Sequence, residues 1–317
     1  MKHVALVTGG AGAIGSRLAA ELLRRDFEVV VLDDLSSGYP ENVPEGARFV
    51  EGSVTDLGLL DRLFTDHGFT YVFHLAALFA NQNSVDHPVQ DLEINGGGTL
   101  ALLERTAHAA EDLGGFQRFL YASSSCVYGN VSGAISEDQP THATETPYAI
   151  TKFLGEQYLQ FFMEHYGLPG TIVRPFNSYG PGERPGRYRN VIPNFIKLAL
   201  RGDPLNITGE GNETRDFTFN GDTVAGIVGA ATSSASQGKA YNLATGQETK
   251  IIDLAKQIIR LSDSTSEIRF TGRRSWDQVT SRCGSITRAR EDFGYTPSTS
   301  LEEGLRLTID WIRSLAP

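Results

Sequence analysis

The sequence contains little cysteine and no long hydrophobic run. Its 317 residues include only two cysteines, Cys126 and Cys283, so a disulfide-bonded scaffold is excluded. No apolar stretch reaches the roughly 18 residues that a membrane-spanning helix needs. The first residues lead into glycine too early for a signal peptide. We therefore expect a soluble, cytoplasmic protein without a membrane partner.

Positive charge is also in short supply. Lysine and arginine total 28 against 38 aspartates and glutamates, which gives a formal net charge of -10. This balance argues against nucleic acid as the main partner, although it leaves room for a local basic pocket that binds phosphate. The fractions of hydrophobic residues (40%) and charged residues (21%) are typical of a folded globular protein.

The first half of the chain alternates short apolar runs with helical patterns. We expect strands at residues 3–8, 27–32, 48–50, 71–75, 118–122 and 171–174, and helices at residues 16–25, 98–110 and 147–166. Apolar strands that alternate with helices predict a parallel sheet covered on both faces, which is the α/β class of doubly wound folds.

The pattern changes after about Pro175. A loop of turn-forming residues occupies positions 181–187, helical patterns follow at 191–200, 251–261 and 300–314, and a short strand is expected at 240–243. This part does not repeat strand and helix regularly. We expect a first domain at residues 1–175 and a smaller lobe at residues 176–317, whose segments interleave with the sheet.

A glycine-rich turn joins the first expected strand to the first expected helix. Gly10, Gly12 and Gly15 satisfy the pattern G-x-G-x-x-G, and Gly9 adds a further glycine. Glycines let the chain turn sharply, let the backbone approach a diphosphate and let the helix pack closely against the strand. The start of the helix then offers free N–H groups and a partial positive charge to the phosphates. The turn therefore predicts a dinucleotide site.

An acidic residue ends the second expected strand. Asp33 follows Gly15 by 18 residues, where a carboxylate accepts hydrogen bonds from the hydroxyls of the adenosine ribose. The same carboxylate would repel a 2′-phosphate. We therefore expect NAD rather than NADP as the cofactor.

Two further groups of residues suggest acid–base chemistry. Tyr148 and Lys152 are spaced i, i+4 on one face of a helix, although a surface pair has the same spacing. An ammonium group near a phenol favours the phenolate, which predicts a lowered pKa for Tyr148 and suits it to act as a general base. Ser123, Ser124 and Ser125 follow a strand directly, at the edge where open α/β sheets bind ligands.

Together these motifs resemble the extended short-chain dehydrogenase/reductase family, in its nucleotide-sugar epimerase/dehydratase branch. The matching segments are residues 8–15, 33, 74–77, 123–129, 148–152, 174–181, 214–217 and 241–243, and the resemblance covers about residues 4–310. It implies a Rossmann-type fold, bound NAD and an enzyme. Tyr148 matches the general base, Lys152 its partner, and Ser124 the hydroxyl that stabilises the developing oxyanion when the sugar is oxidised to a 4-keto intermediate.

The branches of this family differ at Ser125 and Cys126. The 4,6-dehydratases carry Asp and Glu at these positions, and the UDP-glucuronate decarboxylases carry Glu where this chain has Cys126. Neither Ser125 nor Cys126 can act as a carboxylic acid, so the resemblance favours a UDP-sugar 4-epimerase acting on a UDP-hexose or a UDP-hexuronic acid. A UDP-glucuronate decarboxylase stays open as the alternative, since the 4-ketone itself is the electron sink. A dehydratase is less favoured, and so is a non-catalytic NAD-binding protein, because Tyr148 and Lys152 are both present.

The resemblance also implies the residues around each ligand. Around NAD it places Gly9, Gly12, Ala13, Ile14, Gly15, Asp33, Asp34, Ser36, Ser37, Gly38, Ser53, Val54, Leu75, Ala76, Ala77, Ala122, Ser123, Tyr148, Lys152 and Pro175. Around the UDP-sugar it places Ser124, Ser125, Asn177, Asn190, Val191, Arg215 and Arg282, with forked arginine groups on the diphosphate; Arg273 and Arg274 compete with Arg282 for this role. No metal site is expected. Members of the family are commonly homodimers packed through two long helices, for which residues 98–110 and 147–166 are candidates.

Overall fold

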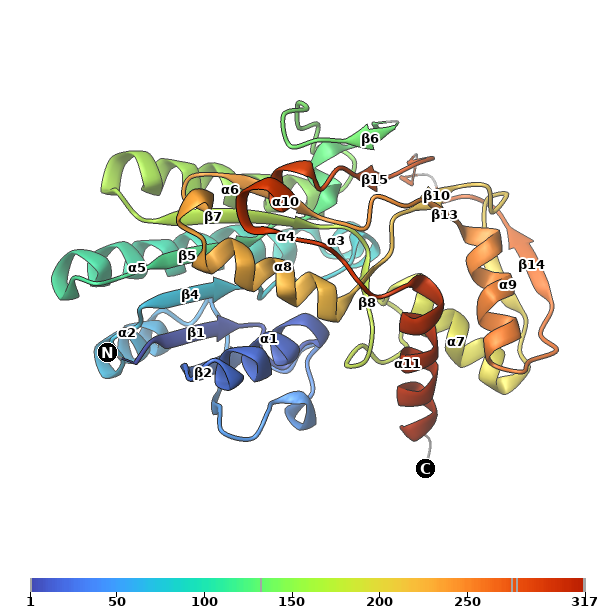
Figure 1. Cartoon of the computed structure of the whole chain (residues 1–317), viewed down its shortest axis with the longest axis horizontal. Helices are drawn as coiled ribbons and strands as arrows, with labels where there is room; N and C mark the ends of the chain where they lie inside the picture. Colours follow the sequence, from blue (N-terminus) through green and yellow to red (C-terminus); the bar gives the residue numbers. More distant parts are fainter. Residues whose placement is uncertain (1, 132, 275, 278, 316–317) are drawn as a thin grey trace.

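A parallel seven-stranded sheet forms the centre of the molecule (Figure 1). The computed structural model describes residues 2–131, 133–274, 276–277 and 279–315. The strand order is β12-β7-β5-β4-β1-β2-β3, and every neighbouring pair is parallel. The strands are β1 (Val4–Thr8), β2 (Glu28–Asp33), β3 (Arg48–Glu51), β4 (Tyr71–His74), β5 (Arg118–Ala122), β7 (Gly170–Pro175) and β12 (Ala240–Leu243). The predicted α/β class and parallel sheet are confirmed.

Helices cover both faces of the sheet because successive side chains of each buried strand point to opposite sides. In β1, Ala5 and Val7 pack under α1 (Ala13–Arg24) and α8 (Asn220–Thr232), whereas Leu6 packs on the opposite face. That second face is covered by α2 (Leu57–Asp66), α5 (Thr99–Leu113) and α6 (Pro147–Tyr166). All these apolar side chains are fully buried, so the sheet is the core of the fold.

A separate apolar cluster lies beyond the carboxyl ends of the strands. It joins α7 (Val191–Arg201), α9 (Ile251–Leu261) and α11 (Leu301–Ser314) with the paired strands β9 (Leu205–Thr208) and β14 (Ile268–Thr271). Figure 1 shows these elements gathered to one side of the sheet. Helix α8 and strand β12 come from the second half of the sequence and belong to the sheet layer itself, since α8 packs on the sheet and β12 pairs with β7.

Short elements connect these layers. They are α3 (Asn81–Asp86), α4 (Pro88–Asp91), the π-helical segment η2 (Leu92–Gly98), η3 (Ser125–Tyr128), α10 (Thr287–Phe293), β6 (Ala134–Ile135), β8 (Ser178–Tyr179), β10 (Thr214–Arg215), β11 (Thr218–Phe219), β13 (Thr249–Lys250) and β15 (Cys283–Gly284), with the single turns η1 (Pro40–Asn42) and η4 (Ser234–Ser236). Within the described part of the chain, no helix is long and apolar enough to cross a membrane.

The predicted helix at residues 147–166 matches α6 at both ends. Thr146 caps its start by accepting a hydrogen bond from the backbone N–H of Ala149 at 3.2 Å, and Gly167 ends it in the left-handed conformation. The predicted helix at residues 98–110 starts one residue later, at Thr99, because the three glycines before it belong to the π-helical segment η2. Helices α2 and α8 were not predicted.

Candidate active site

One cavity of about 590 Å³ opens along the carboxyl ends of the central strands and continues to the helices beyond them. The turns that follow β1, β2, β4, β5 and β7 all reach it, as expected for an open parallel sheet. Every residue predicted to contact NAD or the sugar nucleotide lines this cavity except Gly38. Gly38 instead packs beneath the site, where a Cβ atom would lie 2.8 Å from both Ala11 Cβ and Asp33 Oδ1.

The glycine turn forms a cradle that side chains would fill. Gly9 has a positive φ of 69°, and a Cβ on it would lie 2.8 Å from the backbone nitrogen of Ala76. A Cβ on Gly15 would lie 2.2 Å from the carbonyl oxygen of Gly9. The turn therefore depends on glycine, and it brings the start of α1 to the cavity wall, where its free N–H groups face the space that a diphosphate needs. The residues present fit a dinucleotide cofactor.

Asp33 is fixed by the backbone at the end of β2. Its Oδ2 accepts a hydrogen bond from the N–H of Ala11 and its Oδ1 accepts one from Leu35, both at 2.9 Å. The side chain is buried, and burial raises the pKa of its carboxyl group against the effect of these two bonds. Each oxygen keeps a further lone pair that can accept from a ribose hydroxyl. The two backbone donors thus hold the carboxylate in one orientation at the cavity wall.

One end of the cavity, where the sequence predicts the cofactor contacts after β3, is lined by Ser53 and Val54, and Asp34 and Ser36 also line the cavity. Ser53 Oγ lies 2.9 Å from Thr55 Oγ1, which fixes the turn into α2. The segment 75–77 after β4 forms the opposite wall. The sequence placed these segments around the cofactor, and the structure brings them together.

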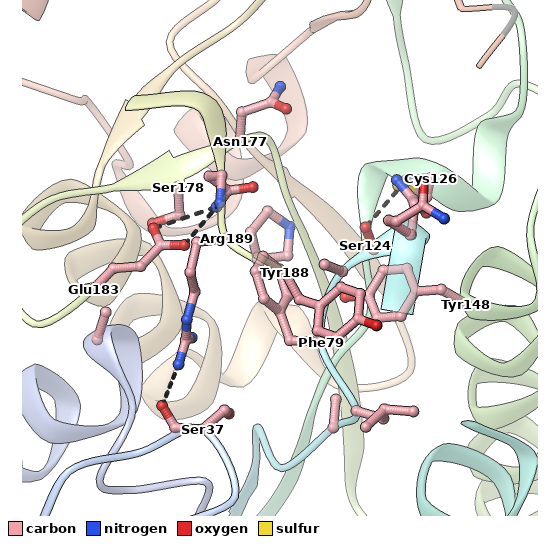
Figure 2. A pocket seen from close by; sticks show the side chains of 18 of the residues that line it. Ser37, Phe79, Ser124, Cys126, Tyr148, Asn177, Ser178, Glu183, Tyr188 and Arg189 are labelled. Carbon is pink, nitrogen blue, oxygen red and sulfur yellow. Dashed lines mark hydrogen bonds between the residues drawn. The ribbon is translucent and has the colours of Figure 1, made fainter. Parts of the chain in front are cut away.

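Tyr148 and Lys152 lie on the face of α6 that is turned toward the cavity floor. Both side chains are buried. Lys152 Nζ donates to the carbonyl oxygen of Ala122 at 2.8 Å and lies 5.8 Å from the centre of the Tyr148 ring. Phe79 packs edge-on against the same ring, with 6.4 Å between the ring centres, as Figure 2 shows.

The predicted lowering of the Tyr148 pKa is wrong for the protein chain by itself. Burial raises the pKa of Tyr148, because the phenolate would lose its hydration, and the neighbouring Ser124 side chain only partly opposes this. Burial also lowers the pKa of Lys152 to about 8. The i, i+4 spacing correctly predicted that the two residues share one helix face. It could not predict that this face is shielded from water.

Ser124 stands at the start of η3, beside Tyr148 (Figure 2). Its Oγ accepts a hydrogen bond from the N–H of Cys126 at 3.2 Å, which leaves its own hydroxyl proton free to be donated into the cavity. Ser123 points the other way and donates to the buried carboxylate of Glu156. Glu156 in turn binds Arg174 through two hydrogen bonds. Only Ser124 of these two serines is therefore free to take part in chemistry.

Asn177 and Asn190 reach the cavity from the segment after β7. Asn177 adopts a positive φ of 30° and donates its amide to the carbonyl oxygen of Asp216 at 3.0 Å. The backbone N–H of Asn190 donates to Glu183 Oε1 at 3.1 Å. Glu183 is buried, and burial raises the pKa of its carboxyl group. The sequence analysis missed Glu183, which holds Asn190 and Val191 at the start of α7 against the cavity.

Arg215 and Arg282 both reach the cavity, so the structure brings together the two arginines that the sequence proposed. Arg215 donates to the carbonyl oxygens of Thr214 and Val279 at 2.8 and 3.1 Å. Arg282 donates to that of Gly129 at 3.1 Å, and its buried Nε has no hydrogen-bond partner among the described residues. Arg273 and Arg274 also line the cavity. Three of these guanidinium groups face carboxylates on the same wall: Arg215 lies 3.6 Å from Asp277, Arg273 lies 3.9 Å from Glu213, and Arg282 lies 3.5 Å from Glu145.

Cys126 and Glu145 lie next to Arg282. The Cys126 Sγ atom is 3.4 Å from Arg282 Nη1 and 3.7 Å from the amide nitrogen of Asn81. Glu145 forms an ion pair with Arg282 at 3.5 Å, and burial raises the pKa of its carboxyl group. Glu145 was not predicted, because no motif marks it. The structure thus places a carboxylate near the position where the sequence has Cys126 instead of glutamate.

The segment 181–190 joins residues predicted to contact the substrate to residues predicted to contact the cofactor. Arg189 donates to the backbone carbonyl of Ser37 at 2.5 Å, and Tyr188 donates to Asp86 at 2.9 Å. Figure 2 shows the Arg189 side chain extended toward Ser37 across the cavity. The loop was recognised in the sequence from its turn-forming residues, but its contacts with residues far away in the chain carry no local signal.

Comparisons with known proteins agree with this geometry. Residues 5–244 match the NAD dependent epimerase/dehydratase family. The chain is 36% identical to a UDP-glucose 4-epimerase of Mycolicibacterium smegmatis, over 98% of each chain, and 34% identical to a UDP-N-acetyl-alpha-D-glucosaminuronate decarboxylase of Bacillus cytotoxicus, over 99% of each. The solved structure of an epimerase from Methanothermobacter thermautotrophicus is 42% identical and superimposes with a TM-score of 0.95, covering 99% of this chain and 93% of that one.

Proposed function

This chain belongs to the NAD-dependent epimerase/dehydratase family, and we propose that it interconverts the C4 epimers of a UDP-hexose or a UDP-hexuronic acid. The observation that carries the proposal is the convergence of Ser124, Tyr148 and Lys152 on one cavity, next to Ser125 and Cys126, where carboxylic acids would be needed for a dehydratase. A 4-epimerase needs no second acid–base pair at that place.

The chain is an NAD-dependent enzyme. We assign the diphosphate of NAD to the glycine turn at Gly9, Gly12 and Gly15, and the adenosine ribose to Asp33. When bound, NAD supplies the acceptor and donor for the hydride of the sugar C4. The remaining chemistry falls to the side chains of the protein.

Three side chains divide that work. Tyr148 takes the proton of the sugar 4-hydroxyl and returns it after the ketone has presented its other face. Ser124 donates its free hydroxyl proton to the oxygen on which negative charge develops. Lys152, held by the carbonyl of Ala122, supplies the positive charge that a buried Tyr148 needs in order to lose its proton, since burial alone disfavours the phenolate.

The nucleotide must stay anchored while the sugar turns. Arg215 and Arg282 are suited to the diphosphate because they combine fixed positions with planar, forked donors. The backbone N–H and the side-chain amide of Asn190 both donate to Glu183, and Asn177, Ser125 and Val191 complete the wall. The buried Nε–H group of Arg282 has no acceptor among the described residues, so it is available to donate a hydrogen bond to a bound ligand.

A second function is favoured by one observation. Glu145 is ion-paired with Arg282 and faces the same cavity as Cys126, so a carboxylate and a guanidinium group stand near the missing glutamate. This pair could serve a UDP-hexuronate decarboxylase, and the Bacillus cytotoxicus relative bears that activity in its name. Loss of CO2 needs the 4-ketone as an electron sink, which the same three side chains would generate with bound NAD as the hydride acceptor, and a proton then takes the place of the carboxylate at C5.

The proposal also covers the oligomeric state and the domain organisation of the protein. We propose a homodimer in which α5 and α6 pack against those of a second copy, because Ile150 and Phe161 of α6 expose about half of their surface, at 50% and 46%. We also propose that residues 1–175 hold the cofactor, that residues 176–317 hold the nucleotide sugar, and that the protein works in the cytoplasm without nucleic-acid or membrane partners.

Product analysis tests the proposed activity. The purified protein is incubated with NAD and, separately, with UDP-glucose and UDP-glucuronate, and the products are identified by NMR and mass spectrometry. An isomer of unchanged mass is expected, and the accepted sugar identifies the group that the cavity takes at C6. Release of CO2 from UDP-glucuronate would instead establish the decarboxylase and would show that a glutamate at the position of Cys126 is dispensable.

Substitution of Tyr148 tests the mechanism. We expect Tyr148→Phe to lower kcat by at least two orders of magnitude, because proton transfer by a positioned side chain contributes on the order of 100- to 10,000-fold. Tyr158→Phe removes a hydroxyl from the same helix away from the cavity and serves as the matched control. Full activity of Tyr148→Phe would show that another residue moves the proton.

A further inference from the structure

Asp91 is a carboxylate buried directly behind the proposed catalytic residues. It lies in α4, is 0% exposed and does not line the cavity. Its Oδ2 accepts a hydrogen bond from Thr151 Oγ1 at 2.6 Å, and its Oδ1 accepts one from the amide of Asn95 at 2.8 Å. Thr151 immediately precedes Lys152 on α6. The sequence analysis did not mark Asp91, and the proposed mechanism does not use it.

The hydrogen bonds around Asp91 are those expected of a carboxylate. Burial raises the pKa of this carboxyl group, and the bond from Thr151 and the charge of Lys152 oppose that rise. The Asn95 amide has one possible orientation, because its Oδ1 accepts from the backbone N–H of Leu78 at 2.7 Å and its Nδ2 must therefore face Asp91. Oδ1 of Asp91 is thus an acceptor, and with Thr151 donating to Oδ2 both oxygens accept, as in a carboxylate. Among the described residues, Asp91 forms no ion pair with an adjacent side chain. A buried charge without a partner is costly, so a nearby positive charge is required to compensate it.

Lys152 is the cation that fits. Its Nζ is buried and donates to a neutral acceptor, the carbonyl of Ala122. Two carboxylates, Asp91 and Glu156, raise the pKa of Lys152 against the lowering caused by burial. Glu156 is already neutralised by two hydrogen bonds from Arg174. That leaves Asp91 as the carboxylate whose charge is not otherwise balanced.

The other groups around Lys152 do not provide a competing negative charge. His74 on β4 is buried between two threonine hydroxyls, and burial lowers its pKa to about 3, so it is neutral. The ring of Tyr121 on β5 lies 5.2 Å from Lys152 Nζ, and burial raises the pKa of that phenol well above its ordinary value. Tyr148, on the same helix, is protonated in the chain by itself for the same reason.

We propose that Asp91 is a positioning residue that acts as the buried counter-charge of Lys152 and, through Thr151, fixes the turn of α6 that carries Tyr148 and Lys152. It touches neither substrate nor cofactor. Its charge keeps Lys152 an ammonium ion at the pH at which the enzyme works, and Lys152 then favours the deprotonated form of Tyr148. This inference rests on the roles proposed above for Tyr148 and Lys152.

Asp91→Asn removes the charge and keeps the shape. The new amide can accept from Asn95 and donate to Thr151, because Thr151 Oγ1 has a second acceptor in the Tyr148 carbonyl at 3.2 Å. Since Asp91 raises the pKa of both Lys152 and Tyr148, both limbs of the pH profile of kcat/KM should move to lower pH, by on the order of 1 unit. At pH 8, close to the Lys152 pKa, activity should fall about fivefold.

Asp222→Asn is the matched control. Asp222 is also buried and accepts hydrogen bonds from the backbone N–H groups of Ser298 and Thr299, at 3.0 and 3.1 Å. Its loss should lower the thermal midpoint without moving either limb of the profile. If Asp91→Asn leaves both limbs in place, or if Asp222→Asn shifts them equally, the counter-charge role is refuted.

NMR separates this inference from the proposed activity. The chain has six lysines, so the ¹³Cε signal of Lys152 can be assigned with a Lys152→Arg variant and titrated without substrate. Its midpoint should fall by about 1 unit in Asp91→Asn, whether or not any UDP-sugar is turned over. In the wild-type protein the carboxyl ¹³C signal of Asp91 should titrate well below the Lys152 midpoint. An Asp91 that is still protonated at that midpoint would overturn the inference without requiring any variant to fold.

Discussion

Gly15→Ala puts the glycine turn to the most direct test. A Cβ at position 15 would lie 2.2 Å from the carbonyl oxygen of Gly9 and 2.8 Å from Gly10 Cα. The first distance is more than 1 Å short of 3.4 Å, where ordinary van der Waals contact begins. Both neighbours are backbone atoms, so no side chain can rotate away. Either the start of α1 or the turn at Gly9 must move by about the size of the shortfall.

The magnitude follows from two opposing effects. Alanine is a better helix former than glycine, which contributes at most about 1 kcal/mol in favour of the variant. Overpacking against fixed atoms costs about 1–3 kcal/mol. We therefore expect a net loss of up to about 2 kcal/mol in the free energy of unfolding. NAD binding suffers more, because one displaced N–H that no longer reaches a phosphate costs about 1.5–3 kcal/mol, or roughly 10- to 100-fold in Kd.

The assay is titration calorimetry with NAD on the apoprotein, together with urea unfolding in its absence. Gly58→Ala is the control, because Gly58 lies in the first turn of α2 and a Cβ there would meet its nearest atom at 3.6 Å. That variant should bind NAD normally and be at least as stable as the wild type. If Gly15→Ala bound NAD with unchanged affinity, the turn would not be the diphosphate cradle, and the cofactor would have to lie elsewhere along the cavity.

Two other predictions follow from buried titratable groups. Asp33→Ala should weaken NAD binding and reduce the preference for NAD over NADP, as measured from the Kd of each; wild-type protein that bound both equally would refute the ribose contact. His74 has its pKa lowered to about 3 by burial, so below its ordinary pKa of 6.5 only the unfolded chain takes up the proton and stability falls as the pH falls. Between pH 7 and pH 5.5 urea unfolding should show a loss about 1.3 kcal/mol larger for wild type than for His74→Asn; equal slopes would mean that His74 is charged in the folded protein.

The sheet could be predicted from the sequence because its strands are short apolar runs between turns. Two of the helices that the sequence analysis missed, α8 and α2, were missed for identifiable reasons. Gly226 and Gly229 suggest a loop by propensity, yet in α8 a Cβ on either would lie within 2.7 Å of Leu243 or Phe293 side-chain atoms. Close packing on the sheet therefore requires the residues that weaken the helical signal. Asp56 caps the start of α2 at Leu59, but this cap was not recognised in the sequence.

The site could be predicted only where a motif places its residues. The glycine turn, Asp33 and the Tyr148–Lys152 pair occupy fixed positions relative to strand ends and one helix face, so their convergence follows from the fold class. Glu145 and Glu183 could not be found in this way, because their partners, Arg282 and Asn190, lie on loops whose paths depend on the whole fold. The exclusion of water from Tyr148 is likewise a property of the packed structure, and no sequence pattern predicts it.

The position of β12 at the edge of the sheet affects how the chain folds during its synthesis. During synthesis β7 emerges long before residues 240–243, so its outer edge has no hydrogen-bonding partner until most of the second half has left the ribosome. An unpaired strand edge is a site for association with other chains. The nascent protein therefore passes through a period in which it is open to aggregation, and this period ends only when β12 pairs with β7. A truncation at the proposed boundary near residue 175 would make that state permanent, so we expect such a fragment to be poorly soluble although it contains all the residues that we assign to the cofactor.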